Sequence, residues 1–183
     1  MRLFGGKKRV TKRELVRTIT DWTVYGFSRD LTQYFHLDLF PDMKKLFDGM
    51  NEERRARAIG ELIILHIFGM LEQLFLAGAT FEIQDEFRRA VMNMIALDLP
   101  RDMEPKQLME YRFAYYRKIW GENNRSGKLG AAVAENIFSA EELAKLPAVK
   151  LLAERAIMKA FEEYMKDTQK MLEGYDLVKL KEE

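Results

Sequence analysis

The sequence has no cysteine among its 183 residues. Disulfide bonds, thiol catalysis and zinc or iron–sulfur sites with cysteine ligands are therefore excluded. Proline is scarce, with four residues, and so is histidine, with two. Few positions therefore interrupt a helix, and few imidazoles are present to bind a metal or move a proton. The basic N-terminus is not followed by an apolar segment with a cleavage site, which argues against a secretory signal. We expect a cytoplasmic protein.

A large charge imbalance is also missing. The 30 basic and 29 acidic residues leave a net charge of +1, which gives no general attraction to nucleic acid or membranes. The local exception is positions 1–17, with seven basic residues and the single acid Glu14. This segment can contact an anionic membrane surface or nucleic acid phosphates, although a solvated segment is the simpler expectation. The basic side chains that precede Glu14 are Arg2, Lys7, Lys8, Arg9, Lys12 and Arg13.

No stretch shows the alternation of apolar and polar residues that is typical of β-strands. Apolar residues instead recur at helical spacing, and the composition, 48% hydrophobic and 32% charged, is that of a globular protein. We predict an all-α, single-domain bundle of about six to eight helices around a long buried central helix. Residues 11–174 would form this domain, with a mobile basic arm over residues 1–10 and a frayed tail over residues 175–183.

The central helix is predicted between Asn51 and Gly78. Asn51 can accept hydrogen bonds from the first turn, and Gly78 favours a left-handed stop. Apolar side chains occupy nearly every face between positions 59 and 76, which is typical of a buried helix. Gly60 and Gly69 inside it predict the close approach of another helix. A membrane span needs roughly 18 uncharged residues, and this run is interrupted by Glu61, His66, Glu72 and Gln73. We therefore do not expect the helix to span a membrane.

Capping and stop signals predict the other helices. A capping box at Thr11–Glu14 begins a helix to about His36, and Pro105 begins another that extends to Trp120. The Gly- and Asn-rich residues 121–128 predict a turn, followed by a short helix over 129–138. The remaining predicted helices are a short one from Pro41 to Gly49, one from Thr80 to about Asp98, and a final long one to about Glu173. A capping box begins at Ser139, and Pro147 either ends a short helical piece or kinks a longer one.

His66 is the sharpest candidate for a functional residue, because an imidazole in an apolar helix can bind a metal or haem or transfer protons. The alternative is a packed structural histidine. The helix offers no second ligand at a metal-binding spacing, and Glu61 lies about 140° away around the helix. We therefore predict no metal and no cofactor, and keep His66 as a candidate ligand-binding residue.

The predicted helix 105–120 is rich in aromatic residues. Tyr116 and Trp120 share one line of this helix with Met109 and Phe113. Such a line either packs in the core or forms a groove for a ligand or partner. Tyr116 and Trp120 are therefore the other two candidate ligand-binding residues.

Two acids of the central helix, Glu61 and Glu72, lie eleven residues apart and hence on one face, about 16 Å from one another. This separation is too large for an acid–base pair. We expect a solvated or ion-paired face, with Arg57 and Glu61 forming an i,i+4 pair.

Three segments appear in the order LIILHIF at 62–68, YRFAYYRKIW at 111–120 and LGAAVAENIF at 129–138. In this order they resemble the ubiquinol–cytochrome c chaperone family. The resemblance rests on apolar helical patterns, and the family's Gly-containing signature between the second and third segments is not found here. It implies a helical assembly factor.

The favoured function is a non-enzymatic interaction, adaptor or assembly-factor protein that binds a protein partner, or itself, through an aromatic and Met-rich helical surface. The alternative is a module that binds an apolar small molecule or lipid in a pocket beside the central helix, with His66 as its polar contact. An enzyme is the third hypothesis. It is ranked last because no nucleophile–base pair or metal cluster is visible in the sequence.

Overall fold

The computed structural model describes residues 7–35, 41–95, 105–121, 125–138, 144 and 147–180. Within these ranges it has seven helices and no β-strand, which confirms the all-α prediction. The predicted capping box at Ser139 and the predicted helix stop near Asp98 lie outside the described residues. The helices are α1 (Lys12–Phe35), α2 (Pro41–Asp48), α3 (Glu52–Leu76), α4 (Phe81–Ile95), α5 (Pro105–Trp120), α6 (Arg125–Ile137) and α8 (Pro147–Glu173).

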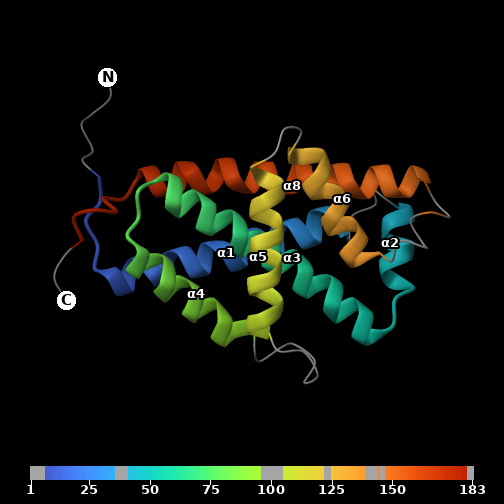
Figure 1. Cartoon of the computed structure of the whole chain (residues 1–183), viewed down its shortest axis with the longest axis horizontal. Helices are drawn as coiled ribbons and strands as arrows, with labels where there is room; N and C mark the ends of the chain where they lie inside the picture. The colour runs from blue at the N-terminus through green and yellow to red at the C-terminus, as the bar shows by residue number, and fades with distance from the viewer. Residues whose placement is uncertain are drawn as a thin grey trace.

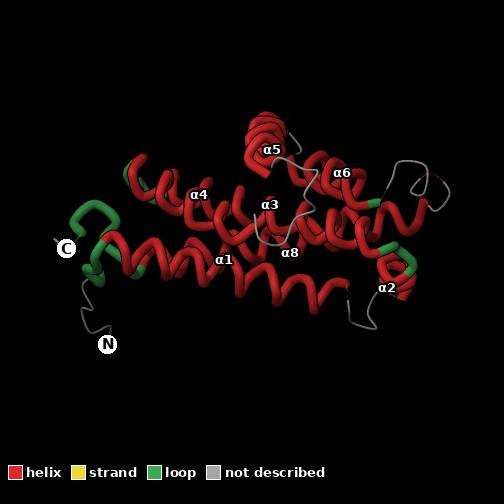
Figure 2. The backbone as a smooth tube through the Cα atoms, turned by 90° about the horizontal axis from the view of Figure 1, so that it is seen from below, coloured by secondary structure: helices red, strands yellow, loops and turns green. Residues whose placement is uncertain are grey.

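Helices α1 and α8 run along the long axis of the molecule, and the start of α1 and the end of α8 lie at the same end (Figure 1). Helix α5 crosses this direction and is seen almost end-on when the molecule is turned (Figure 2). In that view α1 and α5 lie on opposite sides of α3. Helix α3 contacts α1, α4, α5, α6 and α8. One side of α3 therefore faces α1, and the opposite side faces α5.

Local signals place the start of α1 and both ends of α3 as the sequence predicts, and the predicted end of the first helix near His36 lies outside the described residues. The amide of Glu14 donates to Thr11 Oγ1 at 3.2 Å, and the amide of Thr11 donates to Glu14 Oε2 at 3.0 Å, which completes the capping box. The side-chain oxygen of Asn51 accepts from the amide of Arg54 at 2.9 Å. Gly78 follows α3 with φ of +77°, a conformation that glycine adopts without a steric penalty.

Helix α3 is long and apolar enough to cross a membrane by length and composition alone. In this structure 72% of the relevant segment is buried inside the protein. Gly69 lies where α8 comes closest, because a Cβ atom at this position would be 2.7 Å from the Phe161 ring and 2.9 Å from the Met165 sulfur. This confirms the predicted close approach of another helix at Gly69.

Helix α6 begins at Arg125, so the predicted turn over residues 121–128 is wrong in its second half. Leu129 and Val133 are completely buried, and α6 packs closely on α8. Packing of an apolar face stabilises a helix more than intrinsic propensity does. The glycine at position 127 is therefore accommodated in the first turns of the helix.

Residues 7–10 belong to the predicted mobile arm and residues 175–180 to the predicted frayed tail, and the structure pairs these two segments with each other. Lys8 and Tyr175 form a parallel β-bridge. The amide of Lys8 donates to the carbonyl of Gly174 at 2.8 Å, and the amide of Asp176 donates to the carbonyl of Lys8 at 3.1 Å. Val10 and Leu177 are buried, and the burial of apolar side chains stabilises this pairing.

Candidate functional site

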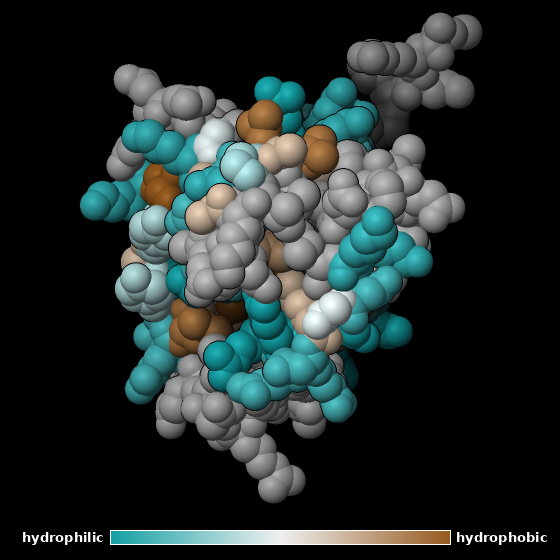
Figure 3. Space-filling model, turned by 90° about the vertical axis from the view of Figure 1, so that its right-hand side faces the viewer, coloured by the Kyte–Doolittle hydropathy of each residue, from teal (hydrophilic) through white to brown (hydrophobic). Residues whose placement is uncertain are grey.

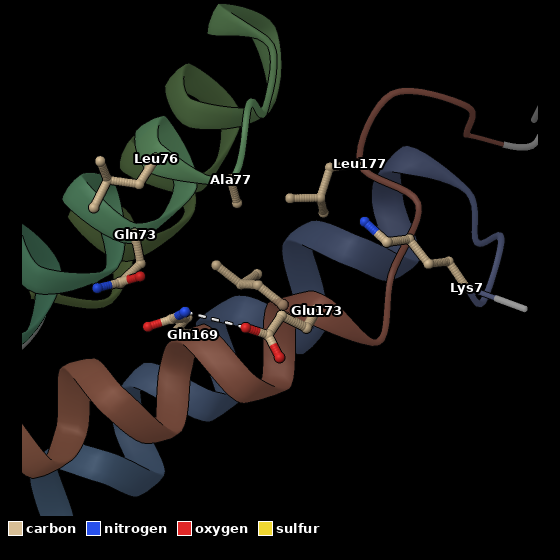
Figure 4. Close-up of a pocket in the computed structure, with 8 residues that line it drawn as sticks. Lys7, Gln73, Leu76, Ala77, Gln169, Glu173 and Leu177 are labelled. Carbon is tan, nitrogen blue, oxygen red and sulfur yellow. Dashed lines mark hydrogen bonds between the residues drawn. The ribbon is translucent and has the colours of Figure 1, made fainter. Parts of the chain in front are cut away.

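A cavity of about 320 Å³ opens at the end of the molecule that holds the paired terminal segments. It lies between the last turn of α3, the last turn of α8 and the segment that follows α8 (Figure 4). This volume is at the lower limit of pockets that bind small molecules. The residues that line it are Lys7, Gln73, Leu76, Ala77, Gln169, Leu172, Glu173 and Leu177.

The wall of this cavity that carries Leu177 is fixed by a turn. Asp176 Oδ1 accepts from the amide of Lys179 at 3.0 Å and from that of Val178 at 3.3 Å. The bridge between Lys8 and the residues after α8 attaches the same turn to the N-terminal segment. The shape of the cavity therefore depends on residues that are more than 160 positions apart in the sequence.

Large exposed apolar side chains lie on the same segments of the chain as the lining residues, or next to these segments in the sequence. Phe75 and Leu76 end α3, and Phe81 begins α4. Val178 lies in the turn that Asp176 forms after α8, which we call the terminal turn. Each of these four side chains is between 66% and 76% exposed. We call these four residues and the cavity the terminal face. Exposed apolar residues that cluster beside a cavity are typical of binding sites, whereas single ones are ordinary surface.

The opposite end of the molecule, beyond α2, has a different surface. Its coloured residues are mostly hydrophilic, with separate hydrophobic groups between them (Figure 3).

The polar groups of the cavity are two amides and two charges. Gln169 Nε2 donates to Glu173 Oε1 at 3.1 Å, and Gln73 Nε2 lies 3.9 Å from the Met165 sulfur, a weak contact. The Lys7 side chain extends toward the cavity from the opposite wall (Figure 4). The site therefore combines an aliphatic floor with a few polar groups at its edge, as binding pockets commonly do.

Protonation of Asp176 is expected to loosen the terminal turn. The amide of Lys179 lowers the pKa of Asp176 most strongly, and the amide of Val178 and the charge of Arg9 lower it further. An acid with a lowered folded pKa stabilises above its unfolded pKa, here 3.8, and this contribution is lost as the pH falls through the folded pKa. We expect hydrogen exchange of residues 177–180, corrected for intrinsic rates, to accelerate in acid.

Replacing Asp176 by alanine should give the accelerated exchange already at neutral pH. The matched control is Asp21→Ala, since Asp21 forms an exposed i,i+4 pair with Arg17. Unchanged exchange in Asp176→Ala would show that the carboxylate does not hold the turn.

The side chain of His66 is not part of the terminal face. Its side chain is 3% exposed and contacts Asp30 of α1, with 2.9 Å between His66 Nε2 and Asp30 Oδ2. The space beside it is about 10 Å³, enough for about one water molecule. The hypothesis of a ligand pocket with His66 as polar contact is therefore not supported by this structure, because aromatic and aliphatic side chains fill the position.

Tyr116 lies on the other side of α3 and is completely buried. Its hydroxyl donates to the carboxylate of Glu61, which also accepts from Arg112 Nε at 3.1 Å and Asn136 Nδ2 at 3.0 Å. Glu61 therefore pairs with Arg112 of α5, not with Arg57 as predicted, and Arg57 contacts Glu53. Burial raises the pKa of Glu61, and the Arg112 charge opposes this shift. The Glu61 carboxylate thus joins α3, α5 and α6, and Tyr116 is buried within this cluster.

The aromatic line of α5 divides between the interior and the surface. Trp120 is partly buried, and its ring packs edge-on against Phe161 with 5.5 Å between the centroids. The exposed rings of α5 are those of Tyr111 and Tyr115, which stack at 6.4 Å. The three candidates His66, Tyr116 and Trp120 are thus distributed over separate contacts and do not form one site.

Neither the models of protein families, nor the curated proteins, nor the solved structures give a match to this chain. The ordering of three helical segments therefore remains a resemblance.

The sequence contains one signal for the terminal face that apolar periodicity does not use. Phe75, Leu76 and Phe81 flank the left-handed glycine at position 78. Large apolar residues on both sides of a helix stop are exposed unless another element covers them. The contribution of residues 7 and 177 has no such signal, since it depends on the pairing of the two ends of the chain.

Proposed function

We propose that this protein is a non-enzymatic, cytoplasmic interaction protein, a single-domain bundle around α3, and that its terminal face binds an apolar segment of a protein partner. The observation that carries this proposal is an open cavity whose lining residue Leu76 is largely exposed, together with the exposed side chains of Phe75, Phe81 and Val178 on the neighbouring segments of the chain. Solvation of these side chains is unfavourable by roughly 25 cal/mol per Å² of apolar area. A partner that covers them gains this free energy.

The surroundings of the terminal face favour a partner segment with acidic flanks. Lys7, Lys8 and Arg9 are exposed beside it, and among the described residues Arg9 pairs with Asp176 at 3.9 Å. Complementary charges increase association rates and select between partners. The exposed pair Tyr111 and Tyr115 on α5 is a second aromatic surface, but no described cavity adjoins it.

Polar substitution of the terminal face tests this function. Phe75→Ser with Phe81→Ser should abolish recovery of the partner in affinity purification, while the thermal midpoint changes little because both rings are mostly exposed. The matched control is Tyr25→Ser on α1, whose ring is 60% exposed, and it should retain the partner. Equal recovery with all variants would contradict the proposal.

The cavity volume itself favours a second candidate, the binding of a small apolar molecule or lipid against Leu76, Leu172 and Leu177. Native mass spectrometry on gently purified protein separates the two candidates. An additional mass of a few hundred daltons that is lost in Leu172→Gln would support the small molecule, and a second chain in the complex would support the protein partner. An enzyme remains the third hypothesis, with no arrangement of described residues in its favour.

A further inference from the structure

We propose that Asp30 and His66 form a buried proton-binding site that holds α1 against α3 and releases this contact when the proton leaves. The proposal is independent of the terminal face. It follows from the partners of the two nitrogens of the His66 ring. Both side chains are almost completely buried, with an exposure of 3% for His66 and 4% for Asp30.

The two hydrogen bonds of the ring determine how many protons the pair holds. His66 Nδ1 lies 2.8 Å from the carbonyl oxygen of Leu62, which can only accept, so Nδ1 carries a proton. His66 Nε2 lies 2.9 Å from Asp30 Oδ2. This contact is a hydrogen bond if the imidazolium donates to a carboxylate, or if a carboxylic acid donates to the neutral ring. In both cases the pair holds one proton more than a neutral histidine with an ionised aspartate, and this proton belongs to the pair.

Loss of this proton leaves lone pairs opposed at one of the two contacts. The ring can then donate either to Leu62 or to Asp30, but not to both. Rotation away from the unfavourable contact is hindered by Phe27, whose ring is 5.9 Å from that of His66, and by Tyr164, whose ring is 4.7 Å away. The proposed response is separation of α1 from α3 around position 30.

The charged and titratable groups around the pair come from α1 and α8. Arg29 Nε donates to Asp30 Oδ1 at 2.8 Å, and Arg29 Nη1 contacts Asp167 of α8 at 3.1 Å. Asp167 is also 3.9 Å from Lys170. Tyr164 donates to Thr23 Oγ1 at 3.2 Å, and burial raises its pKa, so it stays neutral when the pair titrates. The other side chains that line the small space beside the pair are Phe27, Leu31, Leu62, Leu65, Ile157 and Ala160.

The substitution Asp30→Asn distinguishes a bound proton from ordinary packing. An asparagine can donate its amide hydrogen to Nε2 of a neutral ring, while Nδ1 still donates to Leu62 and the amide oxygen still accepts from Arg29. It therefore reproduces the protonated pair with a hydrogen that does not dissociate. We expect α1 in this variant to remain docked at all pH values at which the wild type opens.

Two measurements test the proposal, both on the full chain. The first is the ¹⁵N spectrum of the His66 ring in His36→Gln, a variant that leaves one histidine, together with the ¹³C shift of the Asp30 carboxyl. At neutral pH we expect either two protonated nitrogens with a carboxylate, or Nδ1–H with a carboxylic acid. A neutral ring beside an ionised Asp30 would overturn the proposal. This test does not require a substitution of Asp30.

The second measurement is hydrogen exchange of residues 27–33 between about pH 6 and about pH 10, corrected for intrinsic rates. Above the titration midpoint seen by NMR, the opening of α1 in the wild type should increase about tenfold per pH unit, as expected for the loss of one proton. Exchange in Asp30→Asn should not change with pH. Identical pH dependence in the two proteins, or none in the wild type across the titration, would contradict the proposal.

Discussion

Replacing Arg112 by methionine is expected to lower the free energy of unfolding by about 3 kcal/mol near pH 7.5. Arg112 is 19% exposed and Glu61 is 5% exposed, so methionine keeps most of the packing and removes the charge. The Glu61 carboxylate then stays buried with hydrogen bonds from Tyr116 and Asn136 only. Urea unfolding followed by circular dichroism measures this loss.

The loss should shrink as the pH falls. Burial already raises the pKa of Glu61, and the Arg112 charge opposes that shift, so removing the charge raises the pKa further. A folded protein whose acid has a raised pKa binds its proton at higher pH than the unfolded chain does, and its stability increases as the pH falls through that pKa. We expect the difference between Arg112→Met and the wild type to be smaller near pH 5 than near pH 7.5.

The matched control is Arg117→Met on the same helix. Arg117 contacts Glu72 at 2.9 Å, but its side chain is 65% exposed. Exposed ion pairs contribute about 0–1 kcal/mol, so this variant should differ little from the wild type at either pH. An equal and pH-independent loss in both variants would mean that Glu61 does not depend on Arg112.

Replacing Gly69 by leucine should cost about 3 kcal/mol. The first atom of the new side chain would already be 2.7 Å from Phe161, 2.9 Å from Met165 and 3.2 Å from Tyr164. These three side chains belong to α8, so α8 must move away from α3 or the core side chains must leave their preferred rotamers. Thermal and urea unfolding measure the effect.

Gly121→Leu is the control for the leucine itself. A Cβ atom at position 121 would meet only ordinary contacts, at 3.6 Å and 3.7 Å from backbone oxygens. This variant should change stability by less than about 0.5 kcal/mol. Similar losses at positions 69 and 121 would contradict the close approach of α8 at Gly69.

The helices were largely predictable because their signals are local. The capping box at Thr11, the N-cap Asn51 and the stop at Gly78 act within one turn of the residues concerned. The face that a helix buries was harder to predict. The inner face of α1 includes Leu15 and Ile19 and then continues with Thr23, Gly26 and Asp30, all buried. Apolar periodicity does not detect the second half of this face, because a polar residue is buried only when its partner is present.

The buried polar clusters depend on partners that are distant in the sequence. His66 and Glu61 were correctly expected on different sides of one helix, but Asp30 is 36 residues from His66, and Arg112 is 51 residues from Glu61. No local rule pairs them. Arg57, four residues from Glu61, was the nearer partner by helical spacing, and the packing of α5 against α3 placed Arg112 there instead. The terminal face was missed for the same reason, since the two ends of the chain form it together.

The function proposed for the terminal face is tested most directly by photo-cross-linking in cells that express the full chain. A photoreactive benzoylphenylalanine replaces Phe75 in one variant and Tyr25 in the other, both at mostly exposed positions. We predict a discrete cross-linked protein partner from position 75 and none from position 25. Absence of any cross-link from position 75, or the same products in the same yield from both positions, would contradict it.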